Sequence, residues 1–145
     1  MILRDEVDHV GAAEQAYTLF CDSDVPGIIL GTEENDGGDV RSVHRTAEVL
    51  GMSPVEAGKK ISDCLGRIAA ELILKRKVDR LLVAGGETSG AVCFEAGLEA
   101  LEVGRQIDPG VPYCFPVERD GPMVILKSGN FGEDDLFVRA GVIKT

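Results

Sequence analysis

Aromatic residues are scarce in this sequence, where Phe and Tyr supply the whole aromatic share of 5% and Trp is absent. No apolar run approaches the ~18 residues of a transmembrane helix, and the segment Met1–Asp5 lacks the apolar region of a signal peptide. Lys and Arg number 15 against 25 Asp and Glu, so the net charge is −10. The composition therefore argues against nucleic acid or a membrane as partner, because both attract clustered positive charge. The lack of a transmembrane run and of a signal-peptide region predicts a cytoplasmic protein.

The cysteines form no C-x-x-C pair, which removes the usual zinc and dithiol sites. They are Cys21, Cys64, Cys93 and Cys114. Three lie in apolar stretches, so we expect buried, reduced thiols. His9 and His44 have no partner at ligand spacing, and a surface or helix position is favoured over a catalytic role for each. The sequence identifies no catalytic residue and no metal-binding residue.

Three common motifs are also absent. There is no G-x-x-x-x-G-K-[ST], no G-x-G-x-x-G and no G-x-S-x-G, so a P-loop, a dinucleotide fingerprint and a nucleophile elbow are excluded. The 18 glycines fall mostly between apolar runs, and 44% of the residues are hydrophobic. A chain of 145 residues with this pattern is typical of one globular α/β domain.

The most informative stretch joins an apolar run, Leu81–Ala84, to the glycine-rich segment Gly85–Gly90 and then to a segment with helical spacing. A strand, a loop and a helix are expected here. The helix N-terminus offers unpaired backbone N–H groups, and the glycines let an anion approach them. Glycine turns also serve packing alone, and Thr88 or Ser89 could simply cap the helix. The residues leave both interpretations open.

Helical periodicity predicts further helices on both sides of this stretch. They cover Asp5–Cys21, Val40–Leu50, Ser53 to about Lys77, and a last helix that Glu133–Asp135 opens and that runs to Val142. Ser53, Pro54 and Glu56 form the pattern of a capping box with proline at the first helical position.

Short apolar runs predict the strands. They are Gly27–Thr32, Arg80–Ala84, Val103–Ile107, Val111–Val117 and Met123–Lys127. Pro112 and Pro116 favour an edge strand or an extended loop for the fourth run. The order of elements predicts an α/β fold with a mostly parallel sheet and helices on both faces, three-layered and Rossmann-like.

Several polar positions could border a ligand at the carboxyl ends of these strands. The segment Glu33–Asp39 either borders a site or is a solvated connection. Glu87 could hold Mg²⁺ or a metal-bound water, accept from a ribose hydroxyl, or face away. Lys127 could offset phosphate charge or be an ordinary surface residue. A second glycine turn, Ser128–Gly132, would lie beside Gly85–Gly90 if their strands are neighbours.

Three segments occur in one order: LLVAGGETSGAV at Leu81–Val92, IDPGVP at Ile107–Pro112 and LKSGNFG at Leu126–Gly132. Together they resemble the C-terminal nucleotide-binding domain of the four-carbon acid sugar kinases. The resemblance implies that residues 1–145 are one domain, the nucleotide-binding portion of a two-domain kinase. Such a kinase phosphorylates a terminal hydroxyl of a threonate, erythronate or oxo-tetronate with ATP, and Mg²⁺ is expected with the nucleotide.

The resemblance also implies which residues bind ATP. They are Gly86, Glu87, Thr88, Ser89 and Gly129, and Gly85, in the same glycine-rich segment, is a further candidate for nucleotide binding. The family's acid-binding domain and its serine-containing nucleotide motif have no counterpart in this sequence. We therefore expect weak or no ATP binding by the chain alone, no kinase activity, and a sugar-acid partner only together with the missing domain. An apolar surface left by that domain would favour a homodimer.

Two other functions were weighed against the kinase. A non-catalytic module could use the same glycine loop to bind a phosphate or carboxylate metabolite. A NAD-type Rossmann enzyme is disfavoured, because the fingerprint and a catalytic histidine constellation are both lacking.

Overall fold

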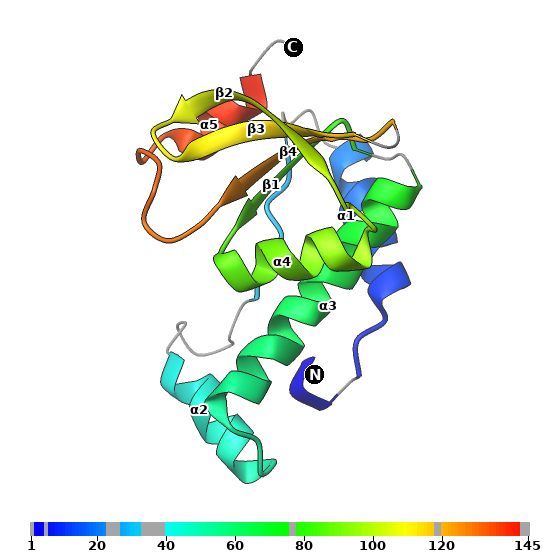
Figure 1. Ribbon diagram of the computed structural model, residues 1–145. Helices are drawn as coiled ribbons and strands as arrows, with labels where there is room; N and C mark the ends of the chain where they lie inside the picture. The colour runs from blue at the N-terminus through cyan, green and yellow to red at the C-terminus, as the bar shows by residue number, and fades with distance from the viewer. Residues whose placement is uncertain are drawn as a thin grey trace.

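A four-stranded sheet lies above two crossing helices in the computed structural model, which describes residues 2–4, 6–22, 27–32, 40–75, 78–117 and 120–142 (Figure 1). The elements in chain order are η1 (Ile2–Arg4), α1 (His9–Asp22), α2 (Val40–Val49), α3 (Pro54–Leu74), β1 (Arg80–Ala84), α4 (Gly86–Glu95), β2 (Leu101–Asp108), β3 (Val111–Pro116), β4 (Met123–Lys127) and α5 (Leu136–Val142).

The sheet is mixed, with strand order β1-β4-β3-β2. Only the β1–β4 pair is parallel, and the other two pairs are antiparallel. The expectation of a mostly parallel sheet is therefore wrong for the described residues. The tight turn at Pro109 and Gly110 joins β2 to β3 as a hairpin, with a φ of 78° at Gly110, and a short turn allows only antiparallel neighbours.

The strand β3 is internal, although its prolines had favoured an edge position. It pairs with β2 on one side and with β4 on the other. Only Tyr113 and Cys114 pair with β4, so Pro112 and Pro116 fall outside that ladder. The β2–β3 ladder is irregular around Gln106, which is the partner of Pro112. Proline is tolerated where a ladder is already interrupted.

The run Gly27–Thr32 does not form the expected first strand. These residues carry no regular secondary structure and are exposed, with Ile29 at 78%. An apolar run becomes a buried strand only when a neighbouring strand pairs with it, and β1 pairs with β4 alone. The polar segment Glu33–Asp39 lies outside the described residues.

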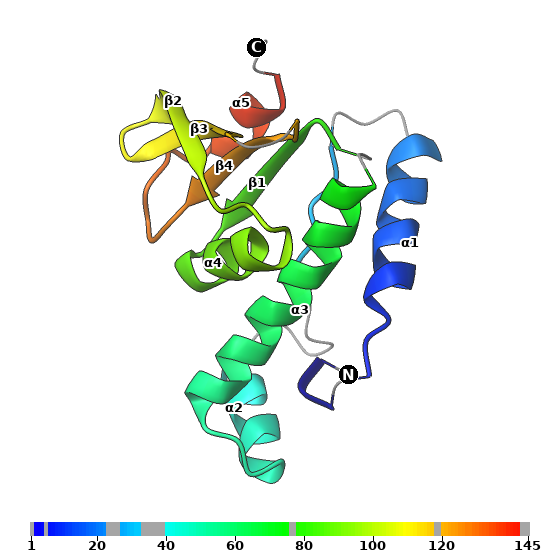
Figure 2. The same ribbon diagram turned by 45° about the vertical axis from the view of Figure 1, so that its right-hand side comes forward.

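The predicted helices are all present, but their bounds change, most of all in α4, which begins at Gly86 within the segment expected as a loop. Ser53 N donates to Glu56 Oε2 at 2.7 Å and Glu56 N donates to Ser53 Oγ at 3.2 Å, which completes the capping box of α3. The first helix begins at His9 and not at Asp5, because Asp8 Oδ1 accepts from Gly11 N at 3.0 Å and so caps it. Helix α1 runs along α3 (Figure 2).

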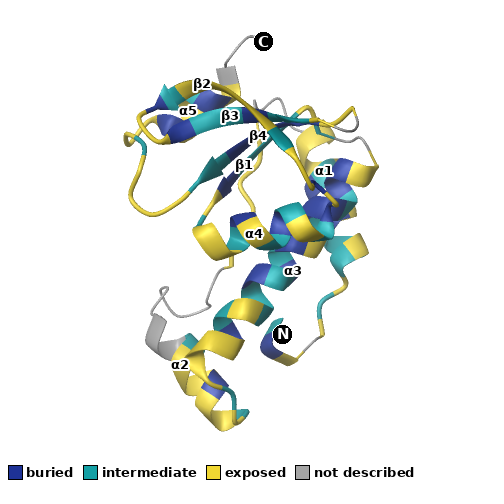
Figure 3. Cartoon of the chain, viewed as in Figure 1, coloured by how far each residue is buried: buried dark blue, intermediate teal, exposed yellow. Residues whose placement is uncertain are grey.

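Strand β4 is buried from Met123 to Ile125 (Figure 3), and its apolar side chains pack on both faces of the sheet. Val124 packs in a cluster with residues of α3, α4 and β1, whereas Met123 and Ile125 pack in a second cluster with Val111 and with Leu136 of α5. This alternation follows the two-residue period of a strand. Helices α3 and α4 thus cover one face, and α5 packs against the other.

Candidate functional site

The two glycine segments meet at the carboxyl ends of the parallel strands β1 and β4. Gly85 N donates to Lys127 O at 2.8 Å. A Cβ atom placed on Gly86 would lie 3.3 Å from Ser128 Oγ. Only Gly85 of the expected loop lies outside a helix, because α4 already begins at Gly86. The segments Gly85–Gly90 and Ser128–Gly132, which keep the names first and second glycine loop, are in contact, as expected if their strands were neighbours.

The first glycine loop turns directly into α4. Gly85 is the N-cap, with a φ of 115° that L side chains rarely adopt, and no side chain caps the helix. Thr88 and Ser89 are thus not caps. The N–H groups of the first turn have no partner within the helix, and the helix dipole adds partial positive charge there. The loop and helix present donors suited to an anion.

Ser89 and Thr88 are placed differently although they are neighbours. Ser89 is 9% exposed, and its hydroxyl oxygen has no hydrogen-bond partner within the part of the chain that the structure describes. Thr88 is half-buried, and its Oγ1 would lie 3.5 Å from a Cβ on Gly85. A buried hydroxyl without a partner is costly unless another group satisfies it.

Glu87 is exposed and its carboxylate lies beside the first third of α3. A Cβ on Gly58 would lie 3.5 Å from Glu87 Oε2. The Glu87 side chain therefore lies within van der Waals reach of position 58. The carboxylate forms the α3 side of the first glycine loop, while Gly86 forms the side toward Ser128.

The second glycine loop begins with a left-handed residue, Gly129, whose φ is 56°. Lys127 Nζ donates to Gly129 O at 2.7 Å. One of the three donors of the Lys127 ammonium group therefore holds the loop that follows it. This places Gly129 next to the end of β4.

The far end of the second glycine loop is held by a group that the sequence reasoning missed. The buried Asp108 carboxylate accepts from Arg139 Nη2 at 2.6 and 2.7 Å and from Glu133 N at 2.8 Å. Arg139, followed by the Glu133 amide, holds the pKa of Asp108 below its usual range. The available signal was an acidic residue directly before the Pro109–Gly110 turn, but its partner lies 31 positions away.

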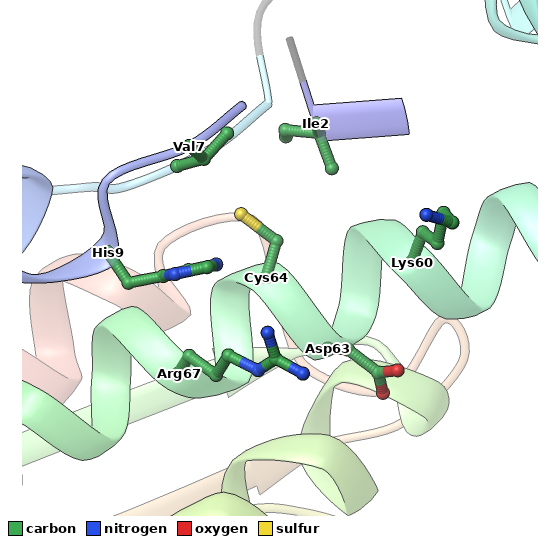
Figure 4. Close-up of a pocket in the computed structure, with 7 residues that line it drawn as sticks. All are labelled: Ile2, Val7, His9, Lys60, Asp63, Cys64 and Arg67. Carbon is green, nitrogen blue, oxygen red and sulfur yellow. The ribbon is translucent and has the colours of Figure 1, made fainter. Parts of the chain in front are cut away.

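A cavity of about 340 Å³ lies away from these loops, between α3 and the N-terminal segment (Figure 4). Its lining residues are Ile2, Val7, His9, Lys60, Asp63, Cys64 and Arg67. The charges there are partly compensated, because Asp63 pairs with Lys59 at 2.6 Å and Arg67 with Glu95 at 3.4 Å. Neither glycine loop contributes a lining residue.

The four cysteines are free thiols. Cys64 and Cys114 are buried and Cys93 is half-buried, as expected, and burial raises the pKa of each of these three thiols. Cys21 is exposed. No group of three or more potential metal-binding side chains is found in the described ranges, and no helix there is long and apolar enough to cross a membrane.

The fold and the paired loops define an α/β domain of the nucleotide-binding class. The family model described as the nucleotide-binding C-terminal domain matches residues 3–137. The chain belongs to this family, the C-terminal nucleotide-binding domains of the four-carbon acid sugar kinases, and the resemblance seen in the sequence is confirmed.

Individual relatives agree with this assignment. A 3-oxo-tetronate kinase of Pseudomonas savastanoi is 40% identical over 127 residues, which are 88% of this chain and 28% of that protein. A 3-oxo-isoapionate kinase of Paraburkholderia graminis is 31% identical over 91% of this chain and 28% of its own length. A crystal structure from Haemophilus influenzae has a TM-score of 0.66 and 31% identity, covering 92% of this chain and 32% of that one. The chain thus spans about 28% of the curated relatives' length.

Proposed function

We propose that this chain binds ATP between the two glycine loops, as the nucleotide-binding part of a kinase for a four-carbon sugar acid of the 3-oxo-tetronate type. The observation that carries the proposal is the contact between Gly86 and Ser128, which joins two anion-compatible loops at one edge of the sheet. The kinase relatives support ATP as the nucleotide. A related protein is named a 3-oxo-isoapionate kinase, so the sugar acid of this chain is proposed only as the 3-oxo-tetronate type.

Each loop residue has a role in this proposal. The N–H groups of Gly86, Glu87 and Thr88 would donate to phosphate oxygens, and Gly85 and Gly129 would allow close approach. The enclosed Ser89 hydroxyl would gain its partner from the nucleotide. Phosphoryl transfer depends mainly on positioning and electrostatic stabilisation. These N–H groups and the Ser89 hydroxyl would position and stabilise the phosphates of ATP, the phosphoryl donor.

The residues of the two glycine loops fit Mg²⁺ only when the ion binds together with the phosphates of the nucleotide. Glu87 is the one carboxylate in the two glycine loops, and no group of three potential ligands is found among the described residues. Mg²⁺ commonly uses one or two carboxylates together with substrate phosphates and waters. When bound with ATP it would neutralise phosphate charge, and Glu87 would be its protein contact.

Other features of the proposal lie beyond the loops. We place the sugar-acid cradle and the catalytic base outside these 145 residues, since the relatives are more than three times as long. The Rossmann-like three-layer arrangement is supported by the parallel β1–β4 pair and by helices on both faces. A cytoplasmic location and a homodimer stay predictions, the latter to be checked by light scattering over a range of concentrations.

Calorimetry with ATP and Mg²⁺ tests the proposal through two matched variants. Gly86→Val places a branched side chain beside Ser128 Oγ, whereas a Cβ at Gly90 would meet nothing within 4 Å. We expect weak binding by the chain, loss of binding in Gly86→Val, and retention in Gly90→Val. Thermal unfolding must show that both variants are folded.

Two outcomes would each contradict one part of this proposal. Stabilisation of the chain by carboxylate metabolites but not by adenine nucleotides would favour a non-catalytic module, because any ligand of the native state raises the melting temperature. Turnover of threonate or erythronate by this chain alone, in a coupled assay, would show that the catalytic base is present here.

A further inference from the structure

The second glycine loop is attached at its far end to the β2–β3 hairpin. Glu133 N, just beyond the loop, donates to Asp108 Oδ2 at 2.8 Å, and Arg139 of α5 donates to both oxygens of the same carboxylate. Arg139 Nη1 also donates to Ile107 O at 3.2 Å. We call this set of contacts the Asp108 latch, because it joins β2, the loop and α5 through one carboxylate.

Close apolar contacts also hold the same loop against the hairpin and against α5. A Cβ on Gly110 would lie 2.9 Å from the Phe131 ring, so the ring rests directly on the turn. A Cβ on Gly132 would lie 2.6 Å from a Leu136 methyl group, and Leu136 is 1% exposed. These contacts leave little room for the loop to shift relative to β2 and β3.

The chemistry of the latch makes it selective for its two partners. Asp108 is 6% exposed, so its charge depends on protein donors and not on water. Arg139 Nη2 contacts both carboxylate oxygens while Nη1 donates to Ile107 O, and a lysine ammonium, with a single nitrogen, cannot span both sites in the same way. Loss of Arg139 would leave the shielded Asp108 charge without its counterion.

The latch and the nucleotide contacts lie at opposite ends of one short loop. At the near end, Lys127 Nζ holds Gly129 O, and Gly86 faces Ser128. At the far end, Asp108 holds Glu133 N. We propose that Asp108 is a positioning residue for the nucleotide, which sets the distance of Gly129 from Gly86 by fixing the far end of the second glycine loop. This inference rests on the proposed function.

Amide hydrogen exchange tests the latch without any nucleotide. In Asp108→Asn we expect faster exchange at Glu133 and at residues 130–132, with protection of the core amide of Val124 retained. Arg139→Lys should show the same effect more weakly. Asp135→Asn is the matched control, because it removes only the charge of the exposed ion pair with Arg139 Nε (2.8 Å) and leaves the latch intact. Unchanged loop exchange in Asp108→Asn would overturn the latch.

ATP titration, well below the melting temperature of each variant, then tests positioning. We expect affinity to fall roughly tenfold in Asp108→Asn, less in Arg139→Lys, and not in Asp135→Asn, in line with ordinary coupling between sites. A purely structural role would instead lower melting temperature without changing the affinity of the folded fraction, and that result would overturn the inference. If Asp108→Asn does not fold, Arg139→Lys decides the outcome.

Failure of the proposed function would look different. If the unaltered chain showed no ATP binding, the proposed function and the nucleotide part of this inference would both fall. The exchange measurements would still decide whether the loop is latched.

Discussion

The two glycine loops are held in place by different kinds of contact. Behind the first glycine loop, α4 lies on α3 so closely that a Cβ on Gly66 would be 2.9 Å from the Ala91 carbonyl carbon, and the neighbouring Val92 is 1% exposed. The second glycine loop is held by Asp108 and Arg139. Apolar packing changes little with pH or salt, whereas a charged latch depends on protonation. The packing behind the first glycine loop is therefore expected to be insensitive to pH, whereas the Asp108 latch at the second glycine loop is expected to be sensitive to it.

The largest expected effect tests the packing of α4 on α3 behind the first glycine loop. Gly66→Val would force α3 and α4 apart, and overpacking of this kind costs about 1–3 kcal/mol, here near the upper end because the contact is with backbone. Urea unfolding measures the loss. Gly90→Ala on the exposed side of α4 is the control, and we expect it to be neutral or stabilising by up to about 1 kcal/mol. An unchanged midpoint in Gly66→Val would mean that this contact does not hold the loop.

The second prediction tests the Asp108 latch through the pH dependence of stability. The pKa of Asp108 is lowered in the folded protein, chiefly by Arg139. Its contribution to stability is therefore fully present above the ordinary Asp pKa of about 3.9 and is lost as pH falls through the lowered value. We expect Asp108→Asn to melt below the unaltered chain near neutral pH, with a difference that shrinks on strong acidification. Melting curves across pH, with Asp135→Asn as control, measure this. A constant difference would contradict it.

The smallest effect concerns the buried hydroxyl of Ser89 in α4. Ser89→Ala removes a buried hydroxyl that has no partner among the described residues, so we expect stability to stay the same or rise by up to about 1 kcal/mol. ATP affinity should fall several-fold if the nucleotide satisfies this hydroxyl. Melting and calorimetry on the same samples separate the two effects. Unchanged affinity would show that the hydroxyl is merely enclosed by packing.

Local structure was predictable wherever the sequence carried a local signal. The strands Arg80–Ala84 and Met123–Lys127 match β1 and β4, and the capping box at Ser53 and Glu56 is formed. Each depends on residues within a few positions of one another. Contact between the two glycine loops also followed from the rule that parallel neighbours share a carboxyl edge.

Features that depend on distant partners were not predictable in the same way. Gly27–Thr32 has the composition of a strand, but composition does not supply the neighbour that a strand requires. The antiparallel half of the sheet follows from the β2–β3 hairpin and from the insertion of β4 between β1 and β3. The role of Asp108 depends on Arg139, 31 positions later. The roles of the loop residues in binding stay predictions that calorimetry will test.

Strand order also has a consequence for how the chain matures during synthesis. The last strand to be made, β4, occupies an inner position between β1 and β3. Until it is available, β1 has no pairing strand among the described residues and β3 has one bare side, and unpaired apolar edges favour aggregation. The two glycine loops can meet only after β4 inserts, since Gly85 N donates to Lys127 O. The nucleotide would therefore bind only after β4 has paired with β1 and β3. Folding intermediates that lack this pairing would not be stabilised by the nucleotide.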